Sequence, residues 1–226
     1  RHPAQTARMA AAVDDLSNGR LTLGLGAGWQ EREHNLFGFD LLNIKNRFDR
    51  FDEGLQVVTG LLKSDTPTSF EGEYFQLRQA VLLPRPQRPG GPKILVGGSG
   101  RRRTMPLAAR YADEWNCIFT QPDSFAALSK VMDGLLAAEK RDPKSLRRSM
   151  MTGCYFGKNE NALREKISAR GLGFDELRNR GVIVGNAGQV REQLQVLSEA
   201  GVQRVMLQWL DLDDLKGLEA LAKAVL

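Results

Sequence analysis

The sequence predicts an α/β protein built on a parallel sheet, and two of its patterns support this class. Short apolar runs alternate with amphipathic, helix-like segments along the whole chain. Within the apolar runs, polar residues do not fill every second position, which is typical of parallel strands buried beneath helices. The 226 residues are 42% hydrophobic and 26% charged, enough apolar material for one large core. We therefore expect a single domain over residues 1–226.

Composition and charge argue against several other classes of protein. The net charge is +5, from 32 basic and 27 acidic residues, and the basic residues are scattered apart from a triplet at 101–103. A nucleic-acid-binding surface more often concentrates basic charge and interleaves aromatic residues with it. No apolar run approaches the roughly 20 residues of a membrane span, and no signal peptide is visible. We expect a cytoplasmic protein with no nucleic-acid or membrane partner.

Cysteine and histidine usage predicts no metal site. Cys117 and Cys154 each lie in a strand-like run without metal-type spacing, so we expect small buried thiols in a reducing compartment. His2 and His34 are the two histidines and lie far apart in the sequence, which favours structural hydrogen-bonding roles. No Ser-His-Asp or Cys-His arrangement is visible.

The first element is a helix, and a strand that ends in glycines follows it. The helix is expected at Pro3–Leu16, and Gly19 suits a left-handed cap after it. Its larger side chains recur at helical spacing at Thr6, Met9, Val13 and Leu16. Residues 20–29 then read RLTLGLGAGW, an extended apolar run that breaks into Gly26, Ala27, Gly28 and Trp29.

This glycine-rich strand end is the stretch around which the chain is organised. In an α/β protein, the carboxyl ends of the strands are where ligand sites collect, and glycines allow close backbone approach. The glycine spacing matches neither the dinucleotide-binding nor the P-loop pattern. The plain alternative is a buried strand that merely ends in a glycine turn.

The middle of the chain predicts two helices and an excursion. A short polar helix is expected at 30–36, with a turn at 38–40, and a longer helix at 47–62. The longer helix carries a core-packing stripe formed by Phe48, Phe51, Leu55, Val58 and Leu62. A small excursion is expected near 64–92, with a hairpin at 69–77 and an extended proline-rich loop at 84–92.

The rest of the chain continues the strand-and-helix rhythm. The expected strands are 93–96, 115–119, 148–156, 182–184 and 204–210. The expected helices are 102–112, 123–141, 161–170, a helix with Val190, Leu194 and Leu197, and 212–226. Asn186 and Gln189 are placed to form a capping box before the fourth of these helices, and Asp211 and Asp213 are expected to begin the last.

A second glycine cluster is the stronger chemical signal. Gly97, Gly98, Ser99 and Gly100 lie between an apolar strand and the start of a helix, and the arginines at 101–103 follow at once. Backbone N–H groups and the positive end of the helix dipole converge at such a place, which favours phosphate binding. The alternative is a glycine turn with solvated arginines.

Trp29 and Glu33, which follow the glycines at 26 and 28, each have two interpretations. Trp29 either forms a wall for a flat ring or packs beneath the loop. Glu33, one helical turn further, either exchanges a proton with a substrate or is a solvated helix charge.

Several stretches, in order, resemble the bacterial-luciferase-like superfamily, and most closely its oxidoreductases that depend on a deazaflavin, coenzyme F-420. The resemblance rests on GRLTLGLGAGW (19–29) within residues 2–40, RFDRFDEGLQVVTGLL (47–62), FEGEYFQL (70–77) with PRPQRP (84–89), KILVGGSG (93–100), RYADEWN (110–116) and GVQRVMLQW (201–209). The first stretch, and the pairing of ILVGGSG with YADEWN, are specific in combination.

The resemblance implies a TIM (β/α)8 barrel, of which this chain would supply roughly strands four to eight. The chain opens on Arg1 rather than methionine, so we expect it to be part of a longer protein whose preceding part carries the catalytic residues. A barrel remainder of five strands would expose apolar strand edges and should associate. The resemblance also implies a homodimer, the usual state of relatives.

The resemblance also implies a flavin-type cofactor at the carboxyl ends of the strands. The phosphate end would lie at residues 97–100, residues 26–29 would line the ring or its chain, and Asn116 and Thr120 would lie near the ring. The expected cofactor-binding residues are Gly26, Ala27, Gly28, Trp29, Gly97, Gly98, Ser99, Gly100, Arg101, Asn116 and Thr120, and the expected substrate-binding residues are Trp29 and Glu33.

The resulting hypothesis is hydride transfer between the deazaflavin and an unidentified organic substrate. One alternative is an FMN-dependent luciferase-like monooxygenase. An alternative of another class is a non-catalytic protein that binds a flavin or another phosphorylated ligand.

Overall fold

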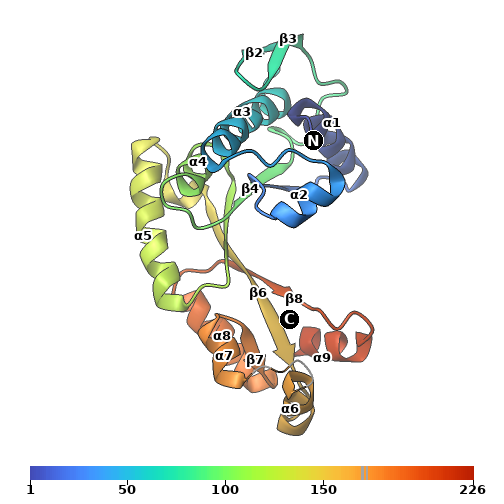
Figure 1. Ribbon diagram of the computed structural model, residues 1–226, viewed down its shortest axis with the longest axis vertical. Coiled ribbons are helices and arrows are strands. Elements are labelled where there is room, and N and C mark those ends of the chain that lie inside the picture. The colour runs from blue at the N-terminus through green and yellow to red at the C-terminus, as the bar shows by residue number, and fades with distance from the viewer. Residues whose placement is uncertain (169–170, 172) are drawn as a thin grey trace. The chain divides into compact units, whose positions relative to one another are not determined.

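The structure is a computed structural model that describes residues 1–168, 171 and 173–226. Contacts between Cα atoms divide the chain into two compact units, Arg1–Glu114 and Trp115–Leu226, which are described in turn. In both units parallel strands are followed by helices (Figure 1), so the predicted α/β class is confirmed. No helix among the described residues is long and apolar enough to cross a membrane.

The first unit holds a parallel strand pair and a small hairpin. Its elements are α1 (Pro3–Leu16), β1 (Thr22–Leu25), α2 (Glu31–Phe37), α3 (Ile44–Lys63), β2 (Thr68–Glu71), β3 (Gln76–Ala80), β4 (Lys93–Gly97) and α4 (Thr104–Tyr111). Strand β1 pairs in parallel with β4, and β2 pairs antiparallel with β3. The predicted hairpin and the glycine-ended strands are therefore present, and α4 begins two residues later than expected.

Apolar side chains of α3, β4 and α4 form the core of the first unit. The predicted stripe of α3 is buried at Leu55, Val58 and Leu62, while Phe48 and Phe51 are half-buried. Helix α1 packs on α3, and its buried residues include Ala7, Ala10 and Ala11.

The buried face of α1 differs from the one its larger side chains suggested. Met9 and Val13 are both 47% exposed and Leu16 is 89% exposed. Alanines allow two helix backbones to approach closely, so the packed face of this helix is the one with small side chains.

Strand β1 is less buried than expected. Leu23 and Leu25 are half-buried and Gly24 is exposed. Among the described residues β1 lies at one end of its sheet and pairs with β4. A strand at such a position has one side without a neighbouring strand, which explains its exposure.

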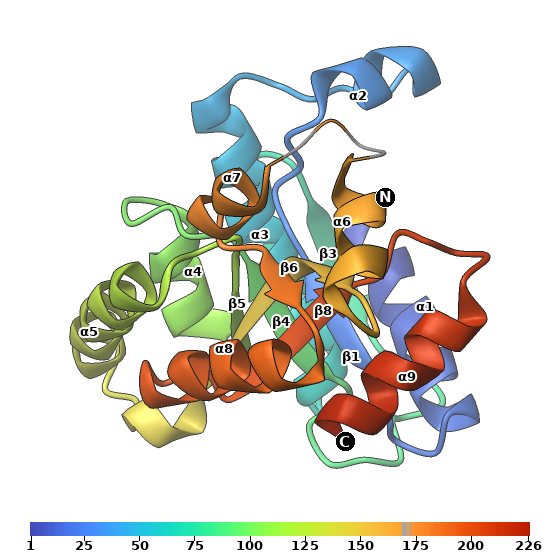
Figure 2. The same cartoon turned by 90° about the horizontal axis from the view of Figure 1, so that it is seen from below.

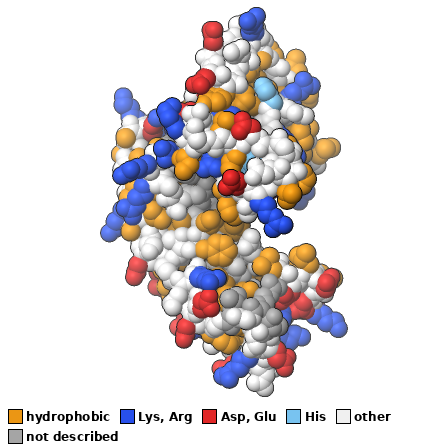
Figure 3. Space-filling model, in the orientation of Figure 1, with side chains coloured by type: hydrophobic (Ala, Val, Ile, Leu, Met, Phe, Trp, Pro, Cys, Tyr) orange, Lys and Arg blue, Asp and Glu red, His pale blue; other side chains and the backbone are white. Residues whose placement is uncertain are grey.

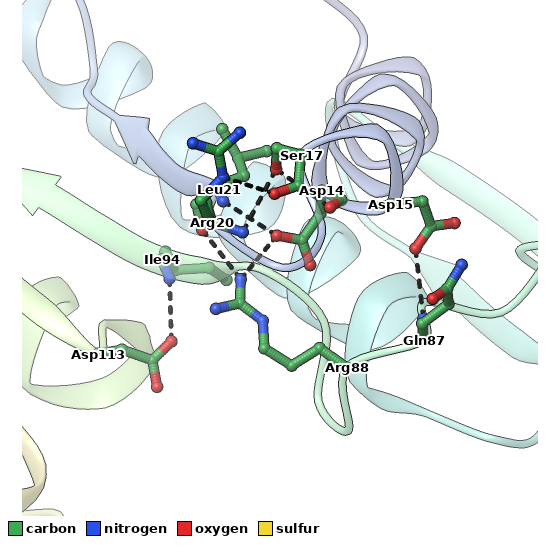
Figure 4. A network of polar contacts seen from close by, with 9 residues as sticks. All are labelled: Asp14, Asp15, Ser17, Arg20, Leu21, Gln87, Arg88, Ile94 and Asp113. Carbon is green, nitrogen blue, oxygen red and sulfur yellow. Dashed lines mark hydrogen bonds and ion pairs between the residues drawn. The ribbon is translucent and has the colours of Figure 1, made fainter.

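A buried ion pair attaches the proline-rich loop to the start of β1 (Figure 4). Asp14 of α1 is 1% exposed, and its carboxylate accepts hydrogen bonds from Arg88 Nη2 at 2.9 Å and from the Leu21 N–H at 3.1 Å. Arg88 Nη2 also donates to the Leu21 carbonyl at 2.9 Å. The proline-rich loop, which was expected at the surface, thus fixes Leu21, the residue just before β1, through Arg88.

The second unit is built around one long strand. Its elements are β5 (Glu114–Ile118), α5 (Pro122–Ala138), a 3-10 turn (Pro143–Ser145), β6 (Arg147–Phe156), α6 (Glu160–Ser168), α7 (Phe174–Asn179), β7 (Ile183–Gly185), α8 (Ala187–Glu199), β8 (Arg204–Gln208) and α9 (Leu215–Val225). The first half of β6 pairs in parallel with β8 and its last residues pair with β7, while β5 lies beside β6 in the strand order. The rings of Trp115 and Phe125 stack in the core at 5.6 Å.

Most expected elements of the second unit are present, with two differences. The capping box of Asn186 and Gln189 at α8 is confirmed. Helix α7 was not expected, and the expected end of the preceding helix at 169–170 lies outside the described residues. Asp211 and Asp213 precede the last helix instead of beginning it, because Asp214 is the residue whose side chain caps it, accepting from the Gly217 N–H.

Candidate functional site

Two glycine-rich loops leave the same edge of the first unit's parallel strands. The register pairs Leu25 with Val96, so the loops that follow β1 and β4 begin side by side. In Figure 2, β1 and β4 lie next to each other within this unit. Because both strands run in the same direction, these are their carboxyl ends, the predicted place for a ligand.

The loop at 26–29 is open and exposed. Gly28 adopts a φ of +81°, which favours glycine, and a side chain there would come within 3.2 Å of His34 Nε2. No atom lies within 4 Å of a side chain built at Gly26. Trp29 is 78% exposed, so it does not pack beneath the loop, and Glu33 is exposed on α2.

The loop at 97–100 presents backbone donors. Ser99 and Gly100 are exposed, and within the described chain their N–H groups have no hydrogen-bond partner. Gly98 has a φ of +121°, and a side chain there would approach Thr104 Cγ2 at 3.1 Å. The glycine at 98 is therefore required both by the backbone conformation and by the close approach of α4.

Positive charge surrounds this second loop. Arg101 and Arg102 are exposed and make no ion pair with the described part of the chain, while the Arg103 guanidinium lies 5.9 Å from the centre of the Phe48 ring. The Gly100 carbonyl accepts from the N–H of Met105 at 3.0 Å, which closes the turn into α4. Exposed N–H groups, a helix start and arginines together form a setting that attracts an anion.

The other two expected cofactor residues, Asn116 and Thr120, belong to the second unit. Asn116 is 5% exposed, and its Nδ2 donates to Ser149 Oγ at 2.9 Å. Thr120 Oγ1 donates to the Ile118 carbonyl at 2.8 Å and lies 2.8 Å from Cys117 Sγ. Both side chains thus have partners inside their own unit.

The histidines have the structural roles that were expected. His2 caps α1, with its Nδ1 accepting from the Ala4 N–H at 3.2 Å. His34 Nδ1 lies 2.7 Å from the Gln30 carbonyl, to which it donates in the matching tautomer. Among the described residues, no group of three or more His, Cys, Asp or Glu side chains is suited to hold a metal ion.

Both cysteines are buried free thiols, as expected. Burial raises the pKa of Cys154 to about 12 and also raises the pKa of Cys117. Raised pKa values favour the protonated thiol at neutral pH, the form that is not nucleophilic.

Sequence reasoning missed a charged cluster that follows β8. Lys166 Nζ lies 2.6 Å from Asp214 Oδ2, 3.4 Å from Asp211 Oδ2 and 4.8 Å from the centre of the Trp209 ring. The Lys166 ammonium lowers the pKa of Asp214, with a further contribution from the Gly217 N–H. No local spacing indicated this cluster, because Lys166 lies on α6, far from the other three residues in the sequence.

Parallel strands that end in glycine loops, with a helix start and arginines beside one of them, are typical of α/β proteins that hold a ligand at the carboxyl ends of their strands. Residues 1–174 match the family model of luciferase-like monooxygenases. The chain belongs to this family, and the resemblance inferred from the sequence is confirmed.

Two curated relatives illustrate the range of the family. A pyrimidine monooxygenase (RutA) of Methylobacterium radiotolerans is 33% identical over 141 residues, which is 62% of this chain and 36% of the relative. The phthiodiolone/phenolphthiodiolone dimycocerosates ketoreductase of Mycobacterium bovis is 30% identical over 172 residues, 75% of this chain and 44% of the relative. The matched part of this chain thus spans less than half the length of either relative.

Solved structures show the same fold at low sequence identity. The coenzyme F-420-dependent tetrahydromethanopterin reductase from Methanopyrus kandleri matches with a TM-score of 0.80 and 18% identity, over 100% of this chain and 79% of that one. The monooxygenase RslO1 from Streptomyces bottropensis matches with a TM-score of 0.80 and 20% identity, over 99% of this chain and 73% of that one. The fold is therefore that of the luciferase-like α/β proteins.

Proposed function

We propose that this chain is part of an oxidoreductase that binds a deazaflavin, coenzyme F-420, and moves hydride between it and an organic substrate. The observation that carries the proposal is the loop at 97–100. There the exposed N–H groups of Ser99 and Gly100 have no partner in the described chain, and Arg101 follows them. The loop at 26–29 begins beside it, at the carboxyl end of the paired strand.

The residues present fit the phosphate end of such a cofactor. Ser99 and Gly100 would donate backbone N–H groups to the phosphate, Gly97 and Gly98 would let it approach the backbone, and Arg101 would add a charge-assisted hydrogen bond. Side chains are absent at Gly97 and Gly26, and the structure has no atoms within 4 Å of where they would project, so a ligand can approach the backbone there. When bound, the deazaflavin supplies a carbon that accepts or returns hydride.

The first loop is proposed to contact the ring or its chain. Gly26, Ala27 and Gly28 would allow close approach, and the exposed indole of Trp29 offers a flat apolar surface for a ring or a substrate. Glu33, which is exposed on α2, would exchange a proton with the substrate. Asn116 and Thr120 remain proposed neighbours of the ring.

An FMN-dependent monooxygenase is the second candidate. It is favoured by the similarity to a relative that is named a pyrimidine monooxygenase. Both candidates use the same phosphate loop, so they differ in the ring that is bound and in whether oxygen is consumed. A non-catalytic binder of a phosphorylated ligand is the third candidate, because residues 97–101 offer donors and positive charge and no general acid or base.

A titration of the protein with both cofactors tests the proposal. Fluorescence quenching is expected to show tight binding of the deazaflavin and weaker binding of FMN. Preference for FMN would favour the monooxygenase, and a bound deazaflavin that stays oxidised with every alcohol or reduced donor tried would favour the non-catalytic binder. Binding of neither would overturn the assignment of the loops.

Two variants tie the binding to the loop at 97–100. Arg101→Gln is expected to weaken binding about tenfold, since a charge-assisted hydrogen bond is worth roughly 1.5–3 kcal/mol. Gly98→Val is expected to weaken it further by blocking backbone approach. Gly134→Val is the matched control, because Gly134 lies exposed on α5 and a side chain there meets no atom within 4 Å. Unchanged affinity in folded Arg101→Gln and Gly98→Val proteins would remove the loop from the site.

We further propose a homodimer as the working form. Sedimentation equilibrium of the protein checks this, and a monomer at micromolar concentration would contradict it.

A further inference from the structure

The second unit contains a pocket that three of its own segments enclose. They are the loop between β5 and α5 (120–122), the end of α7 with the turn into β7 (178–183), and one side of α8 (189–197). We call this the α7–α8 pocket. Its volume is about 410 Å³, and pockets that hold small molecules measure roughly 300–1,000 Å³. The pocket is therefore large enough for a small ligand.

Contacts between these segments give the pocket a fixed shape. Gln121 Nε2 donates to the carbonyls of Arg178 at 2.5 Å and of Asn179 at 3.1 Å, which joins the loop to the end of α7. Gly181 has a φ of +76°, and a side chain there would come within 2.9 Å of the Phe119 carbonyl carbon, so the turn packs directly on the loop. A preformed pocket loses less conformational freedom when a ligand binds.

The buried part of the pocket is aliphatic. Val182, Ile183 and Leu197 line it and are 7%, 3% and 4% exposed. No aromatic side chain is among the described residues that line it. This part of the pocket thus suits an aliphatic group, whose burial is favourable.

Two opposite charges line the same pocket. Arg178 and Glu192 are both exposed, and neither makes an ion pair with the described part of the chain. Arg178 Nη2 lies 3.5 Å from the Val184 carbonyl oxygen, to which Gln193 Nε2 also donates at 3.0 Å, so the guanidinium lies beside α8. Around α7 and α8, which Figure 1 labels, Figure 3 shows basic and acidic side chains at the surface. Most guanidinium donors and the Glu192 carboxylate are therefore available to a ligand.

An amide donor lies on the same side of α8. Gln189 Oε1 accepts from the Asn186 N–H at 2.9 Å as part of the capping box. Within the described chain, Gln189 Nε2 has no hydrogen-bond partner, and the residue lines the pocket. Its amide can therefore donate to an acceptor in the pocket.

We infer that the α7–α8 pocket binds a free α-amino acid with an aliphatic side chain. The carboxylate of this ligand accepts from the Arg178 guanidinium and the Gln189 amide, and its ammonium donates to Glu192. Its side chain lies against Val182 and Leu197. A purely anionic ligand would meet the Glu192 carboxylate and a purely cationic one the Arg178 guanidinium, so a ligand with both charges is favoured.

This site goes beyond the proposed function. Neither of its charged residues is among those proposed to hold the cofactor or its substrate. Thr120, a proposed neighbour of the cofactor ring, lines the pocket as well, but its hydroxyl donates to the Ile118 carbonyl. The inferred recognition of the amino acid therefore uses other groups.

The test is an NMR titration of the 226-residue chain with L-leucine, without cofactor. The side-chain amide signals of Gln189 and Gln193 are expected to shift and to saturate as leucine is added. Two comparison probes each lack one charge: 4-methylpentanoate lacks the ammonium, and 3-methylbutylamine lacks the carboxylate. Each is expected to bind at least about tenfold more weakly than leucine, because a charge-assisted contact is lost.

Two variants assign the two charges of the ligand to their partners. Arg178→Gln is expected to weaken leucine binding at least about tenfold and not to weaken binding of 3-methylbutylamine. Glu192→Gln is expected to weaken leucine binding to a similar degree and not to weaken binding of 4-methylpentanoate. Arg180→Gln and Glu199→Gln are the matched controls, because both side chains are exposed and neither lines the pocket.

The outcomes separate this inference from the proposed function. Saturable leucine binding with this crossed pattern supports it. Absence of saturable shifts, equal affinity for the three probes, or unchanged leucine affinity in either folded variant overturns it. The three probes on the parent protein decide the question even if a variant does not fold. Failure of deazaflavin binding with the leucine results intact would refute the proposed function alone.

Discussion

The buried pair of Asp14 and Arg88 provides the sharpest test of how the first unit is held together. Asp14 is 1% exposed, and Arg88, whose side chain is 27% exposed, is the cation within hydrogen-bond reach of it. Arg88→Met removes that cation and leaves the carboxylate with the hydrogen bond from the Leu21 N–H, at 3.1 Å. It also leaves the Leu21 carbonyl without the bond from Nη2.

Removing one partner of a buried ion pair costs about 3–5 kcal/mol, because the other charge stays buried without compensation. Partial exposure of Arg88 lets water reach the site, so we expect about 3 kcal/mol for Arg88→Met. Asp14→Asn keeps an acceptor for the Leu21 N–H and is expected to cost less. The double variant is expected to cost less than the sum of the two single changes, because the lone charge is no longer present.

Urea unfolding followed by circular dichroism measures these differences. Lys45→Met is the control in the same unit, because the Lys45 side chain is 78% exposed in an ion pair with Asp49 and its loss should leave stability almost unchanged. If Arg88→Met costs no more than Lys45→Met, or if the double variant shows simple additivity, Arg88 does not hold the entry to β1.

Three further predictions concern other groups of the structure. Glu53→Gln should loosen the β2–β3 hairpin by about 1.5–3 kcal/mol, because the Glu53 carboxylate accepts from the N–H groups of residues 73–75. Faster hydrogen exchange at those amides checks this, and unchanged exchange would contradict it. Burial and the bond to Asp52 raise the pKa of Tyr111 to about 12, so the phenol that titrates near 10 when unfolded stays protonated in the folded chain. Its contribution to stability is therefore complete below pH 10 and declines as the pH rises through 12; ultraviolet titration of the parent and of Tyr111→Phe should differ by a phenol ionising near that value. Cys154, with a pKa of about 12, should react with a disulfide reagent only after unfolding, and rapid labelling at pH 8 would show that the thiol is accessible.

Features that depend on neighbours in the sequence were predictable. The apolar runs and helical spacings placed most helices and strands, because each pattern reflects which side of a local element can be buried. Gly19, with a φ of 75°, and the capping box at Asn186 and Gln189 followed from local backbone chemistry. The two glycine loops were predictable for the same reason, since glycine permits conformations and approaches that other residues do not.

Features that depend on residues brought together by folding were not predictable from the sequence. Arg88 reaches Asp14 across 74 positions of sequence, and Lys166 reaches Asp214 across 48. The packed face of α1 was decided by the shape of α3 rather than by its own largest side chains. The exposure of Leu36, Phe37 and Phe39 was equally hidden, because a sequence shows that a side chain is apolar but not whether another element covers it.

The sequence by itself thus determined the family, the order of the elements and the loops at which a ligand is expected. Tertiary structure decided that the two glycine loops begin side by side, since the register of β1 on β4 joins segments that the sequence separates by the hairpin and the proline-rich loop. The physical reason is the range of the forces involved. Backbone preferences act between neighbours in the chain, whereas burial, ion pairing and strand register are settled only when distant segments compete for the same space.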